Sequence, residues 1–296
     1  MNVVWPGSGV VSADEEQRVL DGGLPDLAQR RLRELVAAGV TSSFLDVREF
    51  AVGAAEGVEA VGQVVGASAC RLGVGVVRRT RGPAGRVPIG EPVWREHDGP
   101  IQSWTTARRR AMRRLVDQAR LLEADAVLGI VPRFGVRDVE PKVVEVVMTG
   151  TAVRTGERHV VQPVEPVLGT VSVQEFCLLR RVGVDLAGVV GSCSSVEIAA
   201  GSATRSALAG RWMSVGNVEL ADLSKGVYEA RRLAVQRLAD EARTLGASGV
   251  IGVDLARWLA DPDATHSDSG ITVHLLGTAM RGHPTTRLDA IPLLRL

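Results

Sequence analysis

Two segments of the chain place small and apolar residues at intervals of three and four, with charged residues between them. An α-helix brings positions with this spacing onto one face. The pattern therefore predicts two amphipathic helices whose apolar stripe consists largely of alanine, which lets a helix lie close against a sheet. The stripe residues are Ala107, Ala111, Leu115, Ala119 and Leu122 in the first helix, and Ala230, Ala234, Leu238, Ala242 and Leu245 in the second.

Short valine-rich runs, bounded by glycine and serine, stand before and after each helix. Such runs are typical of β-strands. The predicted strands are residues 58–67, 126–131 and 142–153 around the first helix, and 184–191, 249–253 and 271–280 around the second. Each set predicts an α+β unit with the order strand, helix, strand, strand. A sheet this small leaves an apolar face and an edge uncovered unless it pairs with something else.

The two units are copies of one another. Residues 107–129 and 230–252 align without a gap at an offset of 123, and 13 of the 23 aligned positions are identical. Further matches keep the same order while the offset drifts between 123 and 127, for example Gly62 with Gly188 and residues 150–154 with 277–281. Insertions therefore fall in loops, and the chain is interpreted as a tandem duplication.

The duplication predicts one module at residues 41–160 and a second at 166–284, joined by a Pro-containing linker at 161–165. Residues 1–40 form an N-terminal extension, in which residues 24–38 are expected to form an amphipathic helix with Leu27, Leu32, Leu35 and Val36 on one side. Residues 285–296 form an apolar tail.

The tail has five large apolar residues between Leu288 and Leu296. Full burial of one such side chain contributes roughly 1.5–3 kcal/mol, so leaving all of them in water would be unusual. We therefore expect the tail to dock on a neighbouring subunit or on a separate protein partner. The alternative is an end that is merely frayed, because termini are often loose.

The cysteines and the hydropathy indicate a compartment. Cys70, Cys177 and Cys193 are odd in number, and no two stand at C-x-x-C spacing, which argues against a disulfide framework and favours a reducing cytosol. The N-terminus lacks the pattern of a secretory signal, and no apolar stretch reaches membrane-spanning length. We expect a soluble, cytoplasmic protein without a membrane partner.

Charge points away from nucleic acid as a partner. The 35 basic and 34 acidic residues give a net charge of +1, whereas a general nucleic-acid binder usually has a clear basic excess. One dense cluster between Arg108 and Arg114 could bind phosphate, nucleic acid or an acidic partner. The near-neutral total favours the alternative, a solvated helix face with acidic side chains nearby. The cluster consists of Arg108, Arg109, Arg110, Arg113 and Arg114.

The repeated motif resembles the YbjQ-like family, which is labelled as heavy-metal-binding. Residues 123–129 with 150–153, and 246–252 with 277–280, carry the resemblance. Copy one departs from the motif at Glu123, where copy two has Gly246, and its Pro/Arg-rich residues 73–99 are interpreted as degenerate. The resemblance implies two dodecin-like α+β modules and assembly in rings, since single-domain members form rings of five. It also leaves a metal ion open as a cofactor.

The residues themselves give weak support for metal binding. Soft metal sites need Cys and His side chains that converge, and no Cys or His spacing in the chain is a recognisable site. Cys70 follows Gly66, and Cys193 is expected at nearly the same place after Gly191, so the two could share a thiol position. The alternative is that both are small buried apolar residues. His274, on the last strand, is interpreted as a structural or interface histidine rather than a ligand.

No catalytic motif is found. The dinucleotide-binding G-x-G-x-x-G, the P-loop and the G-x-S-x-G elbow do not occur. We therefore predict a non-enzymatic, homo-oligomeric structural or binding protein without a required cofactor. The alternative is a protein that binds a metal ion or a small ligand at the interfaces of a ring. Because five is odd, two modules per chain imply either five chains in two stacked rings or one pseudo-symmetric ring with an even number of modules.

Overall fold

A computed structural model describes residues 12–39, 41–73, 77–79, 93–137, 142–156, 165–208, 219–259 and 268–283, and the statements below refer to these. Most of the proposed linker and the whole C-terminal tail, including Leu288–Leu296, lie outside the described residues. In this part of the chain, no helix combines the length and the apolar character needed to cross a membrane.

Copy one forms a small antiparallel sheet that packs on one long helix. Its strands β1 (Val58–Arg71), β4 (Ala126–Arg137) and β5 (Val143–Thr155) lie in the order β1-β5-β4. Helix α4 (Asp98–Leu121) packs on β1 and β5, with its alanine stripe buried. A nine-residue helix, α3 (Val47–Ala55), precedes β1.

Copy two repeats this arrangement. Its strands β7 (Asp185–Ala199), β8 (Gly249–Leu259) and β9 (Asp268–Arg281) lie in the order β7-β9-β8, again antiparallel. Helix α7 (Ala221–Thr244) packs on β7 and β9. Helix α5 (Val173–Arg181) precedes β7, and the short α6 (Ser202–Leu208) follows it. The predicted order of strand, helix, strand, strand is confirmed in both copies.

Irregularities of the backbone recur at the same places in both copies. The strand register shifts before Gly62 in β1 and before Gly188 in β7. Gly129 and Gly252, with φ of +63° and +57°, sit within the register shifts of β4 and β8. A left-handed backbone at a bulge favours glycine, because other residues meet a Cβ clash there. Conserved bulges therefore support a common origin more strongly than the shared strand order alone.

Helices α3 and α5 were not expected from the sequence. Each begins with a capping box, formed by Asp46 and Glu49 in α3 and by Ser172 and Glu175 in α5. In such a box the two side chains each accept a hydrogen bond from the other residue's backbone N–H, which satisfies otherwise unpaired donors. The spacing S/D-x-x-E was the signal that could have predicted both helices.

The two copies exchange strands. The short β6 (Val167–Leu168), which leads into copy two, pairs in parallel with β4 of copy one. In return, β2 (Val77–Arg79) and β3 (Val93–His97) from copy one extend the other sheet, where β3 pairs with β7. The first sheet therefore reads β1-β5-β4-β6 and the second β2-β3-β7-β9-β8. Within residues 73–99, which were interpreted as degenerate, the described residues 77–79 and 93–97 build strands that join the copies.

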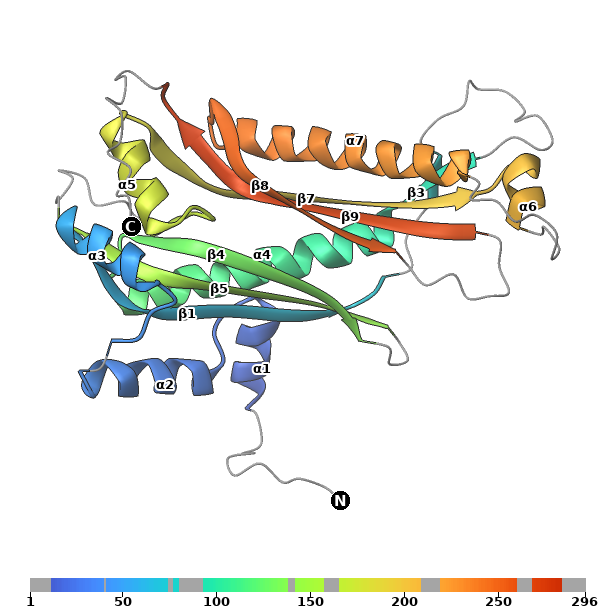
Figure 1. The fold of residues 1–296 in the computed structure, drawn as a ribbon. Coiled ribbons are helices and arrows are strands. Elements are labelled where there is room, and N and C mark those ends of the chain that lie inside the picture. Colours follow the sequence, from blue (N-terminus) through green and yellow to red (C-terminus); the bar gives the residue numbers. More distant parts are fainter. Residues whose placement is uncertain are drawn as a thin grey trace.

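Figure 1 shows α7 along the outer side of the second sheet, and α1 (Ala13–Leu20) and α2 (Asp26–Ala37) beside β1 at the opposite side of the molecule. Besides packing on its own sheet, α4 contacts β7 of copy two. The amphipathic helix expected at 24–38 is present as α2, but of its four apolar residues only Leu32 is buried.

Candidate functional site

The junction between the copies is the most elaborate site among the described residues. Alternate residues of β7 point to opposite faces of its sheet. Ser192 and Ser194 face α7, where their hydroxyls donate to the carbonyls of Ala234 and Ala230 at 2.7 and 2.6 Å. Gly191 and Cys193 face the other way, toward α4 of copy one. The second sheet thus has a helix of its own copy on one face and a helix of the other copy on the second face.

Three aromatic rings from both copies meet at this junction. His274 of β9 stacks on Phe134 of β4, with ring centroids 4.5 Å apart and an interplanar angle of 8°. Trp104 of α4 meets the His274 ring edge-on, with centroids 4.4 Å apart, and lies 5.9 Å from Phe134. In a protein with few aromatic residues, such a cluster fixes how the two copies are oriented.

His274 is held in its neutral form. Its Nε2 atom is buried and has no hydrogen-bond partner in the part of the chain that the structure describes. Burial, and then the nearby positive charge of Arg108, lower the pKa of His274 to about 4. An imidazole in this setting is a packing element whose protonation is opposed by its surroundings.

An ion pair crosses the same junction. The Arg108 guanidinium of α4 contacts the Glu241 carboxylate of α7 at 3.0 Å, and the Arg108 side chain is only 6% exposed. Glu241 also accepts a hydrogen bond from the backbone N–H of Gly191 at 3.2 Å. A Cβ on Gly191 would lie 2.7 Å from the Arg108 guanidinium, so glycine is what lets Arg108 pass over β7.

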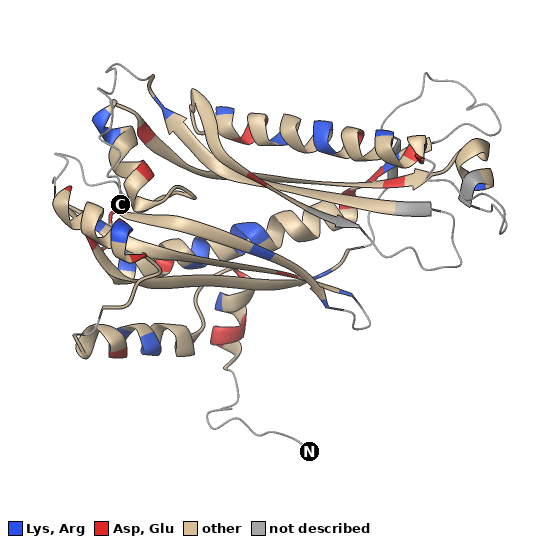
Figure 2. Ribbon diagram, viewed as in Figure 1, with Lys and Arg blue, Asp and Glu red and all other residues tan. Residues whose placement is uncertain are grey.

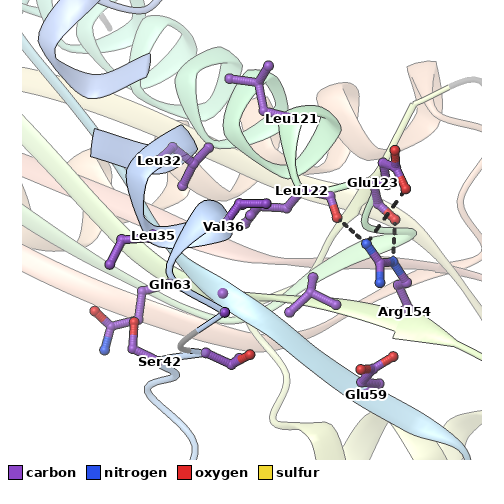
Figure 3. Close-up of a pocket in the computed structure, with 14 residues that line it drawn as sticks. Leu32, Leu35, Val36, Ser42, Glu59, Gln63, Leu121, Leu122, Glu123 and Arg154 are labelled. Atoms are coloured by element: carbon purple, nitrogen blue, oxygen red, sulfur yellow. Dashed lines mark hydrogen bonds and ion pairs between the residues drawn. The ribbon is translucent and has the colours of Figure 1, made fainter. Parts of the chain in front are cut away.

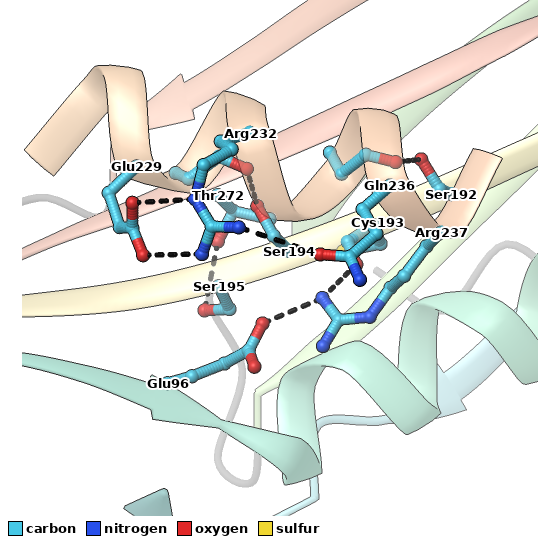
Figure 4. Close-up of polar contacts among 12 residues, drawn as sticks. Glu96, Ser192, Cys193, Ser194, Ser195, Glu229, Arg232, Gln236, Arg237 and Thr272 are labelled. Carbon is cyan, nitrogen blue, oxygen red and sulfur yellow. Dashed lines mark hydrogen bonds and ion pairs between the residues drawn. The ribbon is translucent and has the colours of Figure 1, made fainter. Parts of the chain in front are cut away.

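A polar cluster, drawn in Figure 4, ties β3 to β7 and α7. Glu96 of β3 accepts a hydrogen bond from Arg237 of α7 at 2.6 Å, and this bond raises the pKa of Arg237. Arg237 also donates to the carbonyl of Cys193 at 3.1 Å. The hydroxyls of Ser195 and Thr272 are 3.2 Å apart. Because these groups have partners within the cluster, their arrangement is that of a structural clamp rather than of an activated nucleophile.

The fold brings two of the three candidate metal residues together and separates the third from them. Cys193 and His274 are direct cross-strand partners on β7 and β9. Cys70 lies in the other sheet, on β1. When the strands are aligned on Gly62 and Gly188, Ala67 is the counterpart of Cys193, and Cys70 lies three positions further along. The expectation that Cys70 and Cys193 share one position is therefore wrong, because an odd shift along a strand also turns the side chain to the opposite face.

The surroundings of Cys193 and His274 do not suit a heavy-metal ion. Burial raises the pKa of the Cys193 thiol to about 12, so it keeps its proton, whereas soft metals bind the thiolate. The charges that act on this thiol are the cationic Arg237 and Arg108, and the anionic Glu96, which is paired with Arg237. No group of three or more His, Cys, Asp or Glu side chains that could hold an ion occurs in the described ranges. Two donors beside two cations do not fit the four-ligand sites of zinc or the needs of other thiophilic cations.

The arginine cluster is only in part the solvated face that the charge balance favoured, since Arg109 and Arg113 are exposed. Figure 2 shows basic residues along α4 where it passes beneath the second sheet and above α1. Arg108 and Arg114 are buried. Arg114 donates to the carbonyls of Val19 and Gly23, both at 3.0 Å, and to that of Ala67. Burial, followed by repulsion from Arg110, lowers the pKa of Arg114. The cluster therefore holds α1 against β1 on one side and copy two on the other.

A cavity of about 300 Å³ lies between α2, β1 and the end of α4 (Figure 3). Leu32, Val36 and Leu122 form apolar walls, and Arg154 stands at the rim. Arg154 donates to the carbonyls of Leu122 and Glu123 at 2.8 and 3.0 Å. Arg281 binds the end of α7 in the same way in copy two, so Arg154 has a structural role in closing its helix.

Comparison with known proteins places this architecture in a family. The model of the YbjQ-like family, described as "Putative heavy-metal-binding", matches residues 99–156 and 182–282. An encapsulin nanocompartment protein, Rv1762c of Mycobacterium tuberculosis, is 30% identical over 154 residues, which cover 51% of this chain and 57% of that relative. The match thus spans little more than half of the relative's length. No solved structure matches significantly. The chain belongs to the YbjQ-like family and contains two regions that match its model.

Proposed function

We propose that the protein is a non-enzymatic, cytoplasmic structural and binding unit that assembles with further copies of itself. One observation supports this above the others. The sheet face that copy one buries in copy two has an equivalent on copy one itself, and among the described residues nothing covers that equivalent face.

The equivalent face can be followed across three strands. In the second sheet, Gly191 pairs with Leu276, and this row is covered by α4. Its counterpart in the first sheet is the row of Val65, Thr149 and Val131. Val65 is 44% exposed and Val131 is 54% exposed. Valines at these positions are costly for a solvated sheet face and suit a face that a partner covers.

The matching surface is also present. The outer side of α4 and the end of β4 cover the second sheet, and their counterparts in copy two are the outer side of α7 and the end of β8. Tyr228 and Val235 on α7, and Val253 and Leu255 on β8, are exposed. A second copy of the chain could therefore bring α7 and β8 to the uncovered face, as α4 and β4 are brought within the chain.

Native mass spectrometry and sedimentation of the full chain test this proposal. We expect an assembly larger than a monomer at micromolar concentration. Val65→Asp should weaken it at least tenfold, because a carboxylate would be buried against apolar side chains. The control, Leu27→Asp on the exposed side of α2, should leave it unchanged. A wild-type chain that sediments only as a monomer would overturn the proposal.

A protein partner is the second part of the proposal. The relative from Mycobacterium tuberculosis is named as an encapsulin nanocompartment protein. We propose that this chain also associates with such a nanocompartment, and that the tail at Leu288–Leu296 docks there or on a neighbouring subunit. Co-expression with an encapsulin shell protein and purification of the shell should recover the full chain. Deletion of residues 289–296 should reduce recovery. Equal recovery with and without the tail would remove its role.

Metal content gives an independent test of the binding alternative. Because the Cys193 and His274 pair does not suit a metal ion, we expect less than stoichiometric metal in the purified, untagged protein. Elemental analysis measures this directly. About one zinc or copper ion per chain, lost on Cys193→Ser or Cys70→Ser, would instead favour the binding of heavy metal that the family description suggests.

A further inference from the structure

In each copy, a short segment of the chain leads into the first helix. These segments are residues 41–47 in copy one and 167–173 in copy two, and they correspond at an offset of 126. Both are anchored in the same way to the sheet of their own copy. The backbone N–H of Phe44 donates to Thr151 Oγ1 at 3.0 Å, and that of Thr170 donates to Thr278 Oγ1 at 2.8 Å.

The entry segment of copy two does more than lead into its sheet. Its residues Val167 and Leu168 pair in parallel with Ala126 and Val127, at the edge of the other copy. Four backbone hydrogen bonds join this segment to β4. They run from Val167 to Asp125 at 3.0 Å, from Gly169 to Val127 at 2.8 Å, from Gly129 to Val171 at 2.8 Å and from Ile130 to Gly169 at 3.1 Å.

The entry segment of copy one makes no such pairing within the described residues, although its anchor places it to do so. Val173, at the end of the copy-two segment, is fully buried, whereas its counterpart Val47 is 88% exposed. The strand that corresponds to β4 is β8, and it has β9 on one side and no described strand on the other. One chain therefore ends in a strand edge at β8 and begins with a segment that matches this edge.

We propose that residues 41–47 of a second copy of the chain dock on the edge of β8, where residues 41–45 add as a parallel strand and Val47 begins α3. The internal junction sets the register, with Thr41 opposite Gly249 and Ser42 opposite Val250. It also sets four hydrogen bonds between the chains: Thr41 to Ser248, Ser43 to Val250, Gly252 to Leu45 and Val253 to Ser43, with the donor first. Strand addition of this kind gives affinity through the backbone and specificity through alternate side chains.

Other edges of the sheets have neighbours along part of their length or are short. Helices α1 and α2 lie beside β1, as Figure 1 shows, and β3 pairs with residues 196–199 of β7. Sheet edges are prone to unwanted pairing, and proteins cover or shorten them for that reason. Strand β8, with 11 residues, has no described strand on the side away from β9. Its first five residues, 249–253, are glycine, valine and isoleucine and lack the charged residues that would discourage pairing, whereas Asp254 and Arg257 follow further along.

The proposed contact is heterologous, because it joins two different surfaces of the same chain. Repetition of such a contact closes a ring or builds a filament, depending on the rotation between neighbours. Copy one and copy two would then alternate around one ring, which contains an even number of modules. This contact between residues 41–47 and β8, called the seam below, rests on the proposed self-assembly. It favours the alternating ring over two stacked rings of five.

Site-directed cross-linking tests the seam. The native thiols are first replaced by the residues at the equivalent positions of the other copy, as Cys70→Val, Cys177→Ala and Cys193→Ala. A chain with Ser42→Cys is then mixed with a chain with Val250→Cys and treated with a short thiol-reactive cross-linker. We expect covalent dimers at least tenfold above those from Ser42→Cys mixed with Leu27→Cys, which places the second thiol on exposed α2.

The outcomes separate the seam from the proposed function. A Ser42–Val250 cross-link in an assembly of the wild-type size supports both. An assembly of that size that gives no more cross-link than the Leu27→Cys control would show that the seam is wrong while self-assembly stands. A triple cysteine-replaced chain that sediments as the wild-type does serves as the folding control. A wild-type chain that stays monomeric and gives no cross-link would overturn the seam together with the self-assembly.

Discussion

The same short motif begins one helix in each copy, but its first residue is buried in only one of them. Helix α3 begins Val47-Arg48-Glu49-Phe50 and helix α5 begins Val173-Gln174-Glu175-Phe176, with the same kind of capping box. In α5 the valine is fully buried against α3 and β1, whereas in α3 the valine is 88% exposed. The difference shows that local sequence specifies the helix and its apolar positions, while burial depends on whether a neighbouring copy is present.

The sheet faces differ in a complementary way. On its face toward α4, the second sheet has Cys193 and His274, which contact copy one. The first sheet has Ala67 and Val147 at the equivalent positions, a general apolar surface. The face of copy two therefore fits its contact within the chain. The equivalent face of copy one has the general apolar character that suits a contact between chains.

The largest expected effect comes from the two valines. Val173→Asp would bury an unpaired carboxylate, so we expect a loss of about 3–5 kcal/mol in the free energy of unfolding. Val47→Asp should change the stability of the isolated chain by less than about 0.5 kcal/mol, because an exposed site solvates the charge. Urea denaturation at a concentration where the chain is monomeric measures both.

Val47→Asp, which should hardly change the stability of the single chain, should have a large effect on the assembly. If residues 41–47 form the seam, Val47→Asp should weaken assembly at least tenfold while the fold stays intact. Equal stability losses for both variants would contradict the assignment of Val47 as free in the single chain. An assembly that is indifferent to Val47→Asp would confine the role of this residue to a solvated helix end.

Much of the fold was predictable, because the same pattern of residues occurs in both copies and each occurrence supports the other. The alanine stripes of α4 and α7 and the strands after them followed from periodicity and from the alignment of residues 107–129 with 230–252. The strands are longer than predicted: β4, for example, continues through Pro132 and Gly135 to Arg137. Glycine and proline usually end a strand, but at this exposed part of β4 the usual penalties are small.

The junction could not be predicted in the same way. Residues 93–97 of copy one pair with residues of copy two that lie about a hundred positions later. Nothing local in an arginine-rich segment shows such a pairing. Likewise, Arg108 has the pattern of a surface residue, and only the glycine at position 191 and the carboxylate at 241 make its burial favourable. The interpretation of His274 as a structural histidine remains a prediction that its titration can test.

Acid should loosen the junction through His274. Its pKa is about 4 in the folded chain against an ordinary value of 6.5. Above pH 6.5 both states hold neutral imidazole, so nothing is lost there. Below that, the unfolded chain takes up a proton that the folded chain does not, and the free energy of unfolding falls by up to about 3 kcal/mol as the pH approaches 4.

The matched variant for this prediction is His274→Phe, which keeps a ring against Phe134 and Trp104 but cannot titrate. The quantity to compare is the difference between the wild-type and variant denaturation curves at pH 7 and pH 4.5, because this difference isolates the contribution of position 274. The wild type should lose more stability than the variant. Parallel curves would show that His274 is not held neutral by the junction.

A smaller effect is expected at the ion pair that crosses the junction. Glu241→Gln leaves Arg108 buried without its counter-charge. The amide oxygen can still accept the hydrogen bond from the Gly191 N–H, as the Gln118 amide oxygen accepts one from the Val65 N–H at the equivalent position. We expect a loss of about 2 kcal/mol. Asp240→Asn, next along α7 and paired with Arg243 at the surface, should cost less than about 0.5 kcal/mol. Comparable losses would mean that the junction does not depend on this pair.

The smallest effect, and one of opposite sign, should come from the end of α4. Among the described residues, Glu123 is the non-glycine residue with a positive φ, at +53°, and its counterpart Gly246 has +64°. A left-handed residue just after a helix favours glycine, because glycine has no Cβ to crowd the backbone there. The Glu123 side chain is 87% exposed and lies 3.8 Å from Arg154, so the ion pair adds little. Glu123→Gly should therefore stabilise the chain by about 1 kcal/mol, and Gly246→Ala should destabilise it by a similar amount. Thermal denaturation of the two variants measures the shifts. A lower melting temperature for Glu123→Gly would mean that copy one depends on the Glu123 carboxylate more than on a relaxed backbone, and that the two helix ends are not equivalent.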